Sequence, residues 1–336
     1  MMRDFGGPVQ AIERFALTQN DPREHLGSFA AAVEAGLGER PKSLPCRFLY
    51  DRVGSELFEE ICELPEYYLT RTEHALLESC ADQIAALLPN PVALAELGSG
   101  SSSKTRVLID ALLARQQALR YVPVDISRTA LEDAAQSLLS DYDSLEVHAI
   151  ADEYEEGLRH VQAETERPLI IAWLGSNVGN FDRNGAARFL SGVRNQLRAS
   201  DRLLLGIDLR KDAHTLELAY DDPAGVTARF NLNLLGRINR ELDGNFDLDQ
   251  FAHRAVYRKD EGRVELGLES LKDQEVEIAA LDFVVKFAKH ETIHTEDSHK
   301  YSLDEISVLA AAADLRVQQR WLDDDALYSL NLLAPA

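Results

Sequence analysis

Short apolar runs alternate with amphipathic segments through the middle of the chain. Apolar runs of strand length occur at residues 92–97, 119–124, 145–150, 169–174 and 202–207. Between them, apolar residues recur at helical spacing over residues 103–115, 128–140, 155–163 and 183–198. Strands that alternate with helices form a parallel sheet covered on both faces, and ligands bind beyond the carboxyl ends of its strands. The pattern therefore predicts a doubly wound, Rossmann-like α/β domain.

The pattern changes after Asp208. A helical stretch at residues 213–239 precedes strand-like runs at residues 251–257, 263–271 and 277–287. The chain ends with a helix at residues 303–313 and strands at residues 315–321 and 326–333. A helix followed by two strands resembles the end of a class I methyltransferase sheet, in which the last strand runs antiparallel. We therefore expect an α/β fold of that class with an inserted α+β lobe.

These boundaries divide the chain into two parts. We expect residues 68–209 and 301–336 to form the sheet domain. Residues 19–67 and 210–300 are expected to form the lobe. The ligand site would then lie between the two parts.

The overall charge narrows the choice of ligand. Acidic residues outnumber basic ones by 57 to 35, and the formal net charge is −22. Such a chain repels phosphate backbones and anionic lipid surfaces, which argues against nucleic acid or a membrane as partner.

No apolar run has the length of a signal peptide at residues 1–10 or of a membrane span elsewhere, which predicts a cytoplasmic location. We expect a monomer that acts on a small molecule.

A glycine-rich turn follows the first predicted strand, with the sequence ELGSGSSSKT at residues 96–105. A dinucleotide fold would have a third glycine where Ser102 and Ser103 stand. A phosphate-binding loop would have a second glycine at Ser103. The carboxylate of Glu96 beside the turn disfavours a polyphosphate and favours a cationic ligand. S-adenosylmethionine carries both an ammonium and a sulfonium group.

Acidic residues also follow the next two predicted strands. Asp125 ends the second, at the distance where an acid commonly binds ribose hydroxyls. Asp152, Glu153 and Tyr154 follow the third, where adenine would lie. Acids after three successive strands favour an S-adenosylmethionine-dependent methyltransferase over other α/β enzymes.

Several longer strings resemble the histidine Nα-methyltransferases of ergothioneine biosynthesis. The strings are PKSLP at 41–45, FLYD at 48–51, LPEYY at 64–68, TRTE at 70–73, GSNVGN at 175–180, AYDDPAGVT at 219–227, NREL at 239–242 and FDLD at 246–249. The similarity covers about residues 30 to 336. It implies that S-adenosylmethionine binds the sheet domain and that free L-histidine binds the lobe. The product would be hercynine, the trimethylated betaine.

The resemblance also implies individual roles. The cofactor positions fall on Gly98, Lys104, Asp125, Glu153 and Tyr154, and Asp152 stays an alternative to Glu153 for adenine. The substrate positions fall on Tyr67, Asn180 and Tyr220 for the amino acid and its carboxylate, on Tyr50 and Phe230 near the amine, and on Glu296 and Ser298 for the imidazole. Leu266 stands where the family has a methionine against the ring. A buried carboxylate and hydroxyl would reject side chains without ring nitrogens, because these groups would be left unpaired.

Other interpretations of the function stay open. The same chemistry could serve tryptophan, tyrosine or a histidine derivative, and the turn could instead belong to a nucleotide-binding kinase or a non-catalytic S-adenosylmethionine-binding protein. His290, His294 and His299 cluster in the sequence, but they lack the HExxH pattern, so no metal site is predicted. Methyl transfer from a sulfonium is an in-line displacement, which needs alignment of the amine and exclusion of water rather than a covalent intermediate.

Overall fold

The structure, a computed structural model, describes residues 14–19, 22–163 and 165–336. The prediction about a signal peptide concerns residues 1–10, which lie outside the described residues. Among the described residues, no helix is long and apolar enough to cross a membrane.

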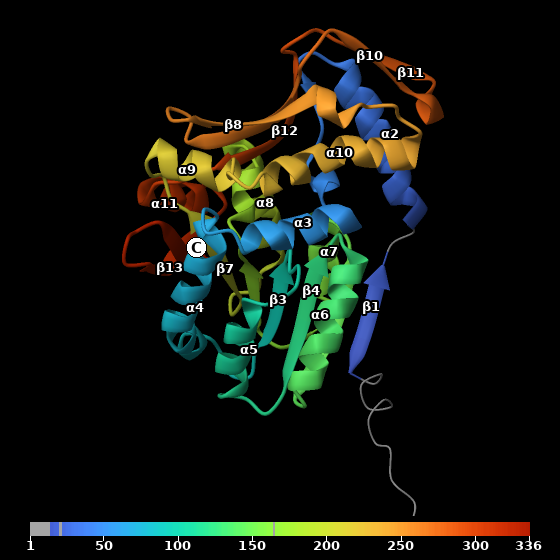
Figure 1. Cartoon of the computed structure of the whole chain (residues 1–336). Coiled ribbons are helices and arrows are strands. Elements are labelled where there is room, and N and C mark those ends of the chain that lie inside the picture. Colours follow the sequence, from blue (N-terminus) through green and yellow to red (C-terminus); the bar gives the residue numbers. More distant parts are fainter. Residues whose placement is uncertain (1–13, 20–21, 164) are drawn as a thin grey trace, which may run out of the picture.

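An eight-stranded sheet forms the centre of the molecule (Figure 1). Its order is β1-β5-β4-β3-β6-β7-β14-β13. The strands are β1 (Phe15–Gln19), β3 (Ala93–Leu97), β4 (Leu119–Asp125), β5 (Leu145–Ala151), β6 (Leu169–Trp173), β7 (Arg202–Asp208), β13 (Leu315–Leu322) and β14 (Tyr328–Pro335). All pairs are parallel except those that β14 makes with β7 and β13. The predicted doubly wound sheet with an antiparallel ending is confirmed.

The helices between the strands cover both faces of the sheet. On one face, α4 (Tyr68–Ala86), α5 (Thr105–Leu113) and α6 (Arg128–Asp141) share a hydrophobic core with the strands. On the other, α7 (Tyr154–Val161), α8 (Arg183–Gln196) and α11 (Leu303–Ala312) do the same. Because these strands are buried on both faces, their sequences are continuous apolar runs.

The remaining elements, apart from a short 3-10 helix between β6 and α8, pack around a separate hydrophobic core. They are α2 (Pro22–Gly38), β2 (Lys42–Ser43), η1 (Cys46–Leu49), α3 (Arg52–Cys62), α9 (Ala213–Tyr220), α10 (Val226–Leu242), η3 (Leu248–Gln250), β8 (Phe251–Arg258), β9 (Arg263–Ser270), β10 (Gln274–Ile278), η4 (Ala279–Leu281), β11 (Phe283–Phe287) and β12 (Thr292–His299). Strands β2-β12-β9-β8 form a second sheet, and β10 and β11 form a hairpin. Figure 1 shows α10, β8 and β12 beyond the arrowheads of β3 and β4.

The predicted single helix at residues 213–239 is wrong, because the chain turns between α9 and α10. Pro223 cannot continue a helix, and Gly225 adopts the left-handed conformation, with φ of +70°. The Asp222 carboxylate accepts hydrogen bonds from the backbone N–H groups of Val226 at 2.9 Å and Thr227 at 2.7 Å. These bonds satisfy the first N–H groups of α10.

The prediction also misplaced one strand-like run and missed two strands. The run at 277–287 is not one strand, since the chain reverses at Asp282, whose φ is +49°. The strand β12 was missed because its polar sequence, TIHTEDSH, is typical of an exposed loop. The edge strand β1 was missed because it is short and lies far along the chain from β5, its parallel partner.

Candidate functional site

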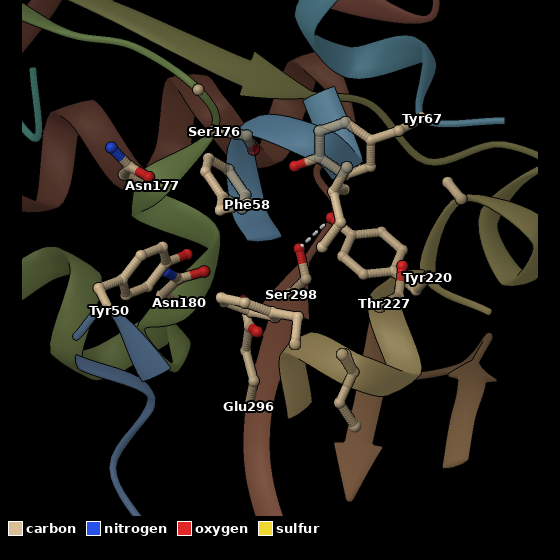
Figure 2. A pocket seen from close by; sticks show the side chains of 15 residues that line it. Tyr50, Phe58, Tyr67, Ser176, Asn177, Asn180, Tyr220, Thr227, Glu296 and Ser298 are labelled. Atoms are coloured by element: carbon tan, nitrogen blue, oxygen red, sulfur yellow. Dashed lines mark hydrogen bonds between the residues drawn. The ribbon is translucent and has the colours of Figure 1, made fainter. Parts of the chain in front are cut away.

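A pocket lies between the lobe elements and the carboxyl end of the sheet. It is lined by all eight side chains that the sequence assigned to the substrate: Tyr50, Tyr67, Asn180, Tyr220, Phe230, Leu266, Glu296 and Ser298. The chain from Gly175 through η2 (Asn177–Asn180), just after β6, forms the wall on the sheet side. Figure 2 shows Tyr50 and Asn180 on one side, Tyr67 and Tyr220 on the other, and Glu296 and Ser298 between them.

Aromatic rings form much of the wall. The Phe58 ring lies 5.5 Å from Tyr50, 6.2 Å from Tyr67 and 6.0 Å from Phe230, between ring centroids. The Tyr67 and Tyr220 rings meet edge to face at 6.0 Å. Aromatic faces attract a cation, and their attraction strengthens when water is excluded. This wall suits an ammonium group that becomes permanently charged.

Helix α3 holds part of this wall in place. The Asp51 side chain accepts a hydrogen bond from the Gly54 backbone N–H at 2.8 Å, which caps the start of α3. The same carboxylate accepts bonds from Asn233 at 2.7 Å and Arg240 at 2.6 Å, both on α10. Asp51 therefore fixes α3, which carries Phe58, against α10, which carries Phe230.

Strand β12 presents the two residues predicted to contact an imidazole. Side chains two apart on a strand point to the same face, so Glu296 and Ser298 face the pocket together. Leu266 on β9 is the register partner of Glu296, which places it beside that carboxylate. A bulge between His294 and Glu296 sets this register.

The polar groups of the pocket fall into two kinds. The hydroxyls of Tyr220 and Ser298 are hydrogen-bonded to each other at 2.8 Å, shown dashed in Figure 2. In the described part of the chain, the side chains of Tyr50, Tyr67, Asn180 and Glu296 have no hydrogen-bond partner. Burial raises the pKa of Glu296 to about 7, and the positive charge of Lys300 only partly opposes this effect. These four side chains are available to a ligand.

The glycine-rich turn lies next to this pocket. Gly98 has φ of +71°, and a Cβ there would lie 2.7 Å from both the Asn177 amide nitrogen and the Tyr154 hydroxyl. The Gly100 backbone N–H donates to Asp125 at 2.9 Å. The close approach at Gly98 requires glycine, and the turn is fixed to the end of β4.

The acids after β4 and β5 differ in exposure. Asp125 is half-buried and accepts bonds from two backbone N–H groups, those of Gly100 at 2.9 Å and Ser127 at 2.8 Å. Burial raises its pKa, and these bonds oppose the rise. Asp152 is buried, whereas Glu153 is exposed and lies 3.2 Å from Arg47. Tyr154 packs edge to face on Trp173, with the ring centroids 5.9 Å apart.

The carboxylate of Glu96, which we expected to influence the choice of ligand from beside the turn, points into the protein interior. Its side chain is buried and accepts hydrogen bonds from Thr105 at 2.6 Å and from the Tyr121 hydroxyl. Burial raises the pKa of Glu96 to about 7, although both hydrogen bonds lower it. Glu96 therefore ties β3 to the start of α5 and to β4 from inside the protein.

Lys104 pairs with a buried carboxylate that the sequence did not single out. Its ammonium donates to Glu73, which also accepts from the Gly175 backbone N–H at 2.9 Å and the Tyr328 hydroxyl at 2.8 Å. Burial lowers the pKa of Lys104, but Glu73 raises it more. Glu73 thus fixes both Lys104 and the loop that lines the pocket.

Some pocket residues were not predicted. Phe58, Asn177 and Thr227 line the site, and the last two lie inside strings that carry the family resemblance. Phe58 stands on an amphipathic helix, where an inward aromatic residue has the pattern of ordinary core. Within residues 14–19, 22–163 and 165–336, no group of three or more His, Cys, Asp or Glu side chains is arranged to hold a metal ion.

The sheet order, the antiparallel β14, and the glycine turn followed by Asp125 define an S-adenosylmethionine-dependent class I methyltransferase. The family described as histidine-specific, S-adenosylmethionine-dependent methyltransferases matches residues 29–335. The chain belongs to this family.

Curated relatives cover nearly the whole chain. The histidine N-alpha-methyltransferase of Mycobacterium tuberculosis strain CDC 1551 is 41% identical over 316 residues, covering 92% of this chain and 98% of its own. The Mycolicibacterium smegmatis enzyme of the same name is 42% identical over 300 residues, with coverages of 89% and 92%. An L-tryptophan methyltransferase of Psilocybe serbica is 28% identical, with coverages of 92% and 94%.

Proposed function

We propose that this protein transfers methyl groups from S-adenosylmethionine to the α-amino group of L-histidine. Three successive transfers give hercynine, the first step of ergothioneine biosynthesis. The observation that carries the proposal is the placement of Glu296 and Ser298 side by side in a pocket with the other six predicted substrate residues. The names of the two mycobacterial relatives support histidine over tryptophan as the substrate. These two enzymes are 41% and 42% identical to this chain, whereas the tryptophan methyltransferase is 28% identical. We expect the enzyme to act as a monomer in the cytoplasm.

We assign S-adenosylmethionine to the carboxyl ends of β3, β4 and β5. Gly98 leaves room there that a Cβ would fill, and Asp125 keeps free lone pairs for ribose hydroxyls. Tyr154 would lie against the adenine, with Glu153 or Asp152 at its edge. Lys104 would meet the carboxylate of the cofactor. The bound cofactor supplies the electrophilic methyl group.

We assign the substrate by the polarity of the pocket walls. Tyr67, Asn180 and Tyr220 would hold the carboxylate, while Glu296 and Ser298 would bind the two ring nitrogens and Leu266 would pack on the ring. Tyr50 and Phe230, with centroids 5.4 Å apart, would enclose the amine. This arrangement would aim the nitrogen lone pair at the methyl carbon.

The tyrosines serve as orienting groups rather than bases. Burial raises the pKa of Tyr50 and of Tyr67 well above the usual value, so both hydroxyls stay protonated at neutral pH. The α-ammonium must lose its proton before the nitrogen attacks, and because the pKa of such a group is about 8 in peptides, water or a weakly basic neighbour could take that proton. The aromatic rings then stabilise the cationic product by cation–π attraction.

A direct test is incubation of the protein with methyl-labelled S-adenosylmethionine and each amino acid in turn. We expect labelled hercynine from histidine, and much less product from tryptophan or tyrosine. Failure to form any labelled trimethylated product from histidine contradicts the proposal. A thermal-shift comparison of S-adenosylmethionine with magnesium ATP separates a methyltransferase from a kinase. Only the ligand that binds the folded protein raises the melting temperature, and we expect that ligand to be S-adenosylmethionine.

The imidazole assignment is tested by Glu296→Ala. Removing a charged hydrogen-bond acceptor should weaken histidine binding by about 10- to 100-fold. Titration calorimetry in the presence of S-adenosylhomocysteine measures this, and unchanged affinity for histidine would reject the assigned contact. Binding of S-adenosylhomocysteine itself, which should not change, is the control for folding.

We also propose that the chain works as two lobes, with residues 68–209 and 301–336 binding the cofactor and residues 19–67 and 210–300 binding the substrate. Separate hydrophobic cores support this division. The edge strand β1, which ends at Gln19, belongs with the sheet.

A further inference from the structure

A buried lysine lies directly behind the substrate pocket. Lys300 follows β12 and is fully buried. Its ammonium donates to the Tyr220 hydroxyl at 2.7 Å and to the Ser298 hydroxyl at 2.9 Å, and it lies 2.8 Å from a carboxylate oxygen of Asp208. Lys300 itself does not line the pocket.

Lys300 belongs to a buried cluster of charged side chains that also contains Asp208 and Lys211. Asp208 also pairs with Lys211 at 2.5 Å and accepts from the Tyr68 hydroxyl at 2.8 Å. Burial raises the pKa of Asp208, but the two lysines lower it more, so its carboxylate stays ionised. Burial lowers the pKa of Lys300, but Asp208 and Tyr220 raise it more, so Lys300 stays charged. The positive charge of Lys300 therefore lies directly against the Tyr220 and Ser298 hydroxyls at the pocket wall.

The number of hydrogens determines what the two hydroxyls can offer a ligand. An ammonium donates three hydrogen bonds and accepts none, so both the Tyr220 and the Ser298 hydroxyl must accept from Lys300. Each hydroxyl has one hydrogen, and the bond between the two hydroxyls uses one of them. The pair therefore presents a single hydrogen to the pocket.

The substrate carboxylate determines whether Tyr220 or Ser298 donates that hydrogen to the ligand. A charged acceptor forms a stronger hydrogen bond than a neutral ring nitrogen. With the substrate carboxylate against Tyr220, the free hydrogen stays on Tyr220, and Ser298 donates to Tyr220. Ser298 then keeps one lone pair, which can accept from a ring N–H.

We propose that Lys300 is a positioning residue that directs these hydrogen bonds and makes the pocket selective for amino acids with a free carboxylate. This inference rests on the proposed function, because it takes histidine as the substrate and its carboxylate as the partner of Tyr220. Lys300 acts through Tyr220 and Ser298 rather than by touching the substrate.

The test compares L-histidine with L-histidinol, in which an alcohol replaces the carboxylate. Calorimetry of both ligands is carried out in the presence of S-adenosylhomocysteine. We expect Lys300→Met to weaken histidine by about 10- to 100-fold, the range for a hydrogen bond to a charged group. Binding of histidinol should change little, so the preference of the wild-type protein for histidine collapses. Equal weakening of both ligands, with unchanged binding of S-adenosylhomocysteine, would overturn the inference.

The matched control is Lys211→Met. Lys211 is a second buried lysine on Asp208, but it contacts neither Tyr220 nor Ser298. We expect this substitution to leave the ratio of the histidine and histidinol affinities unchanged. A collapse of the ratio in Lys211→Met as large as in Lys300→Met would assign selectivity to the charge cluster as a whole and would overturn a specific role for Lys300.

A double-mutant cycle tests whether Lys300 acts through Tyr220. If it does, Lys300→Met should cost much less histidine affinity in the Tyr220→Phe protein than in the wild-type protein, because only the effect through Ser298 remains. Additive losses would overturn the inference. If Lys300→Met does not bind S-adenosylhomocysteine, Lys300→Gln, which keeps donors but removes the charge, replaces it in every comparison. A wild-type protein that fails to bind histidine would instead contradict the proposed function, so the two failures are distinguishable.

Discussion

The carboxylate of Glu296, which is half-buried, destabilises the ligand-free protein in a pH-dependent way. Burial raises its pKa from 4.5 to about 7 in the folded state. A raised pKa contributes stability that is complete below about pH 4.5 and is lost as the pH rises towards 7. We therefore predict that Glu296→Gln increases the free energy of unfolding by about 2 kcal/mol at pH 8, and far less at pH 5.

Urea unfolding at the two pH values measures this effect. Glu265→Gln on β9 is the control, because the hydrogen bond from Arg258 lowers the pKa of Glu265 and its substitution should reduce stability at pH 8. An equal gain from Glu296→Gln at both pH values would contradict the prediction.

Gly98 is the second residue whose environment allows a definite prediction. Alanine at this position would be strained at φ of +71° and would meet Asn177 and Tyr154 at 2.7 Å. We predict that Gly98→Ala costs about 1–2 kcal/mol in stability from backbone strain and sharply reduces the affinity for S-adenosylhomocysteine. The control is Gly192→Ala on α8, where a Cβ meets no atom within 4 Å and a helical alanine should stabilise. Equal cofactor affinity in both variants would contradict this account.

At the scale of elements, the junction between α9 and α10 supports the substrate wall. Asp222→Ala removes the carboxylate that binds the first N–H groups of α10, which should cost about 1–2 kcal/mol. Because Tyr220 ends α9 just before this junction, we also predict an increased KM for histidine. Asp201→Ala removes a carboxylate that accepts from the backbone N–H groups of Leu169 at 2.9 Å and Arg198 at 2.8 Å, at the amino ends of β6 and β7, and it should reduce stability without changing that KM. Denaturation and steady-state kinetics together decide between the two outcomes.

The sequence predicted the elements that repeat a simple pattern. Strands buried on both faces, such as β6, are continuous apolar runs and could be placed within one or two residues. Strand β12 could not, because its pocket face must be polar to bind a ligand, which removes the alternation that identifies a strand. The eight substrate positions came from family resemblance, whereas Lys300 and Glu73 depend on contacts between distant segments that no local pattern encodes.

At the scale of the whole molecule, most of the substrate residues lie on elements of the lobe, whereas Asn180 and the cofactor residues lie on the sheet domain. We predict that S-adenosylhomocysteine alone slows amide hydrogen exchange in the glycine turn and at the end of β4. Added L-histidine should then slow exchange in β12 and α10, because the substrate orders the lobe. Hydrogen-exchange mass spectrometry measures both steps. Protection of β12 by S-adenosylhomocysteine alone, with no further change on adding histidine, would contradict separate binding by the two lobes.

The register of β12 against β9 also has a consequence for redesign. The three side chains proposed to contact the ring, Leu266, Glu296 and Ser298, lie on two neighbouring strands of one small sheet. The residues assigned to the methyl donor follow strands of a different sheet. New side-chain specificity could therefore be selected from a small library at these three positions, while the reaction centre keeps its geometry.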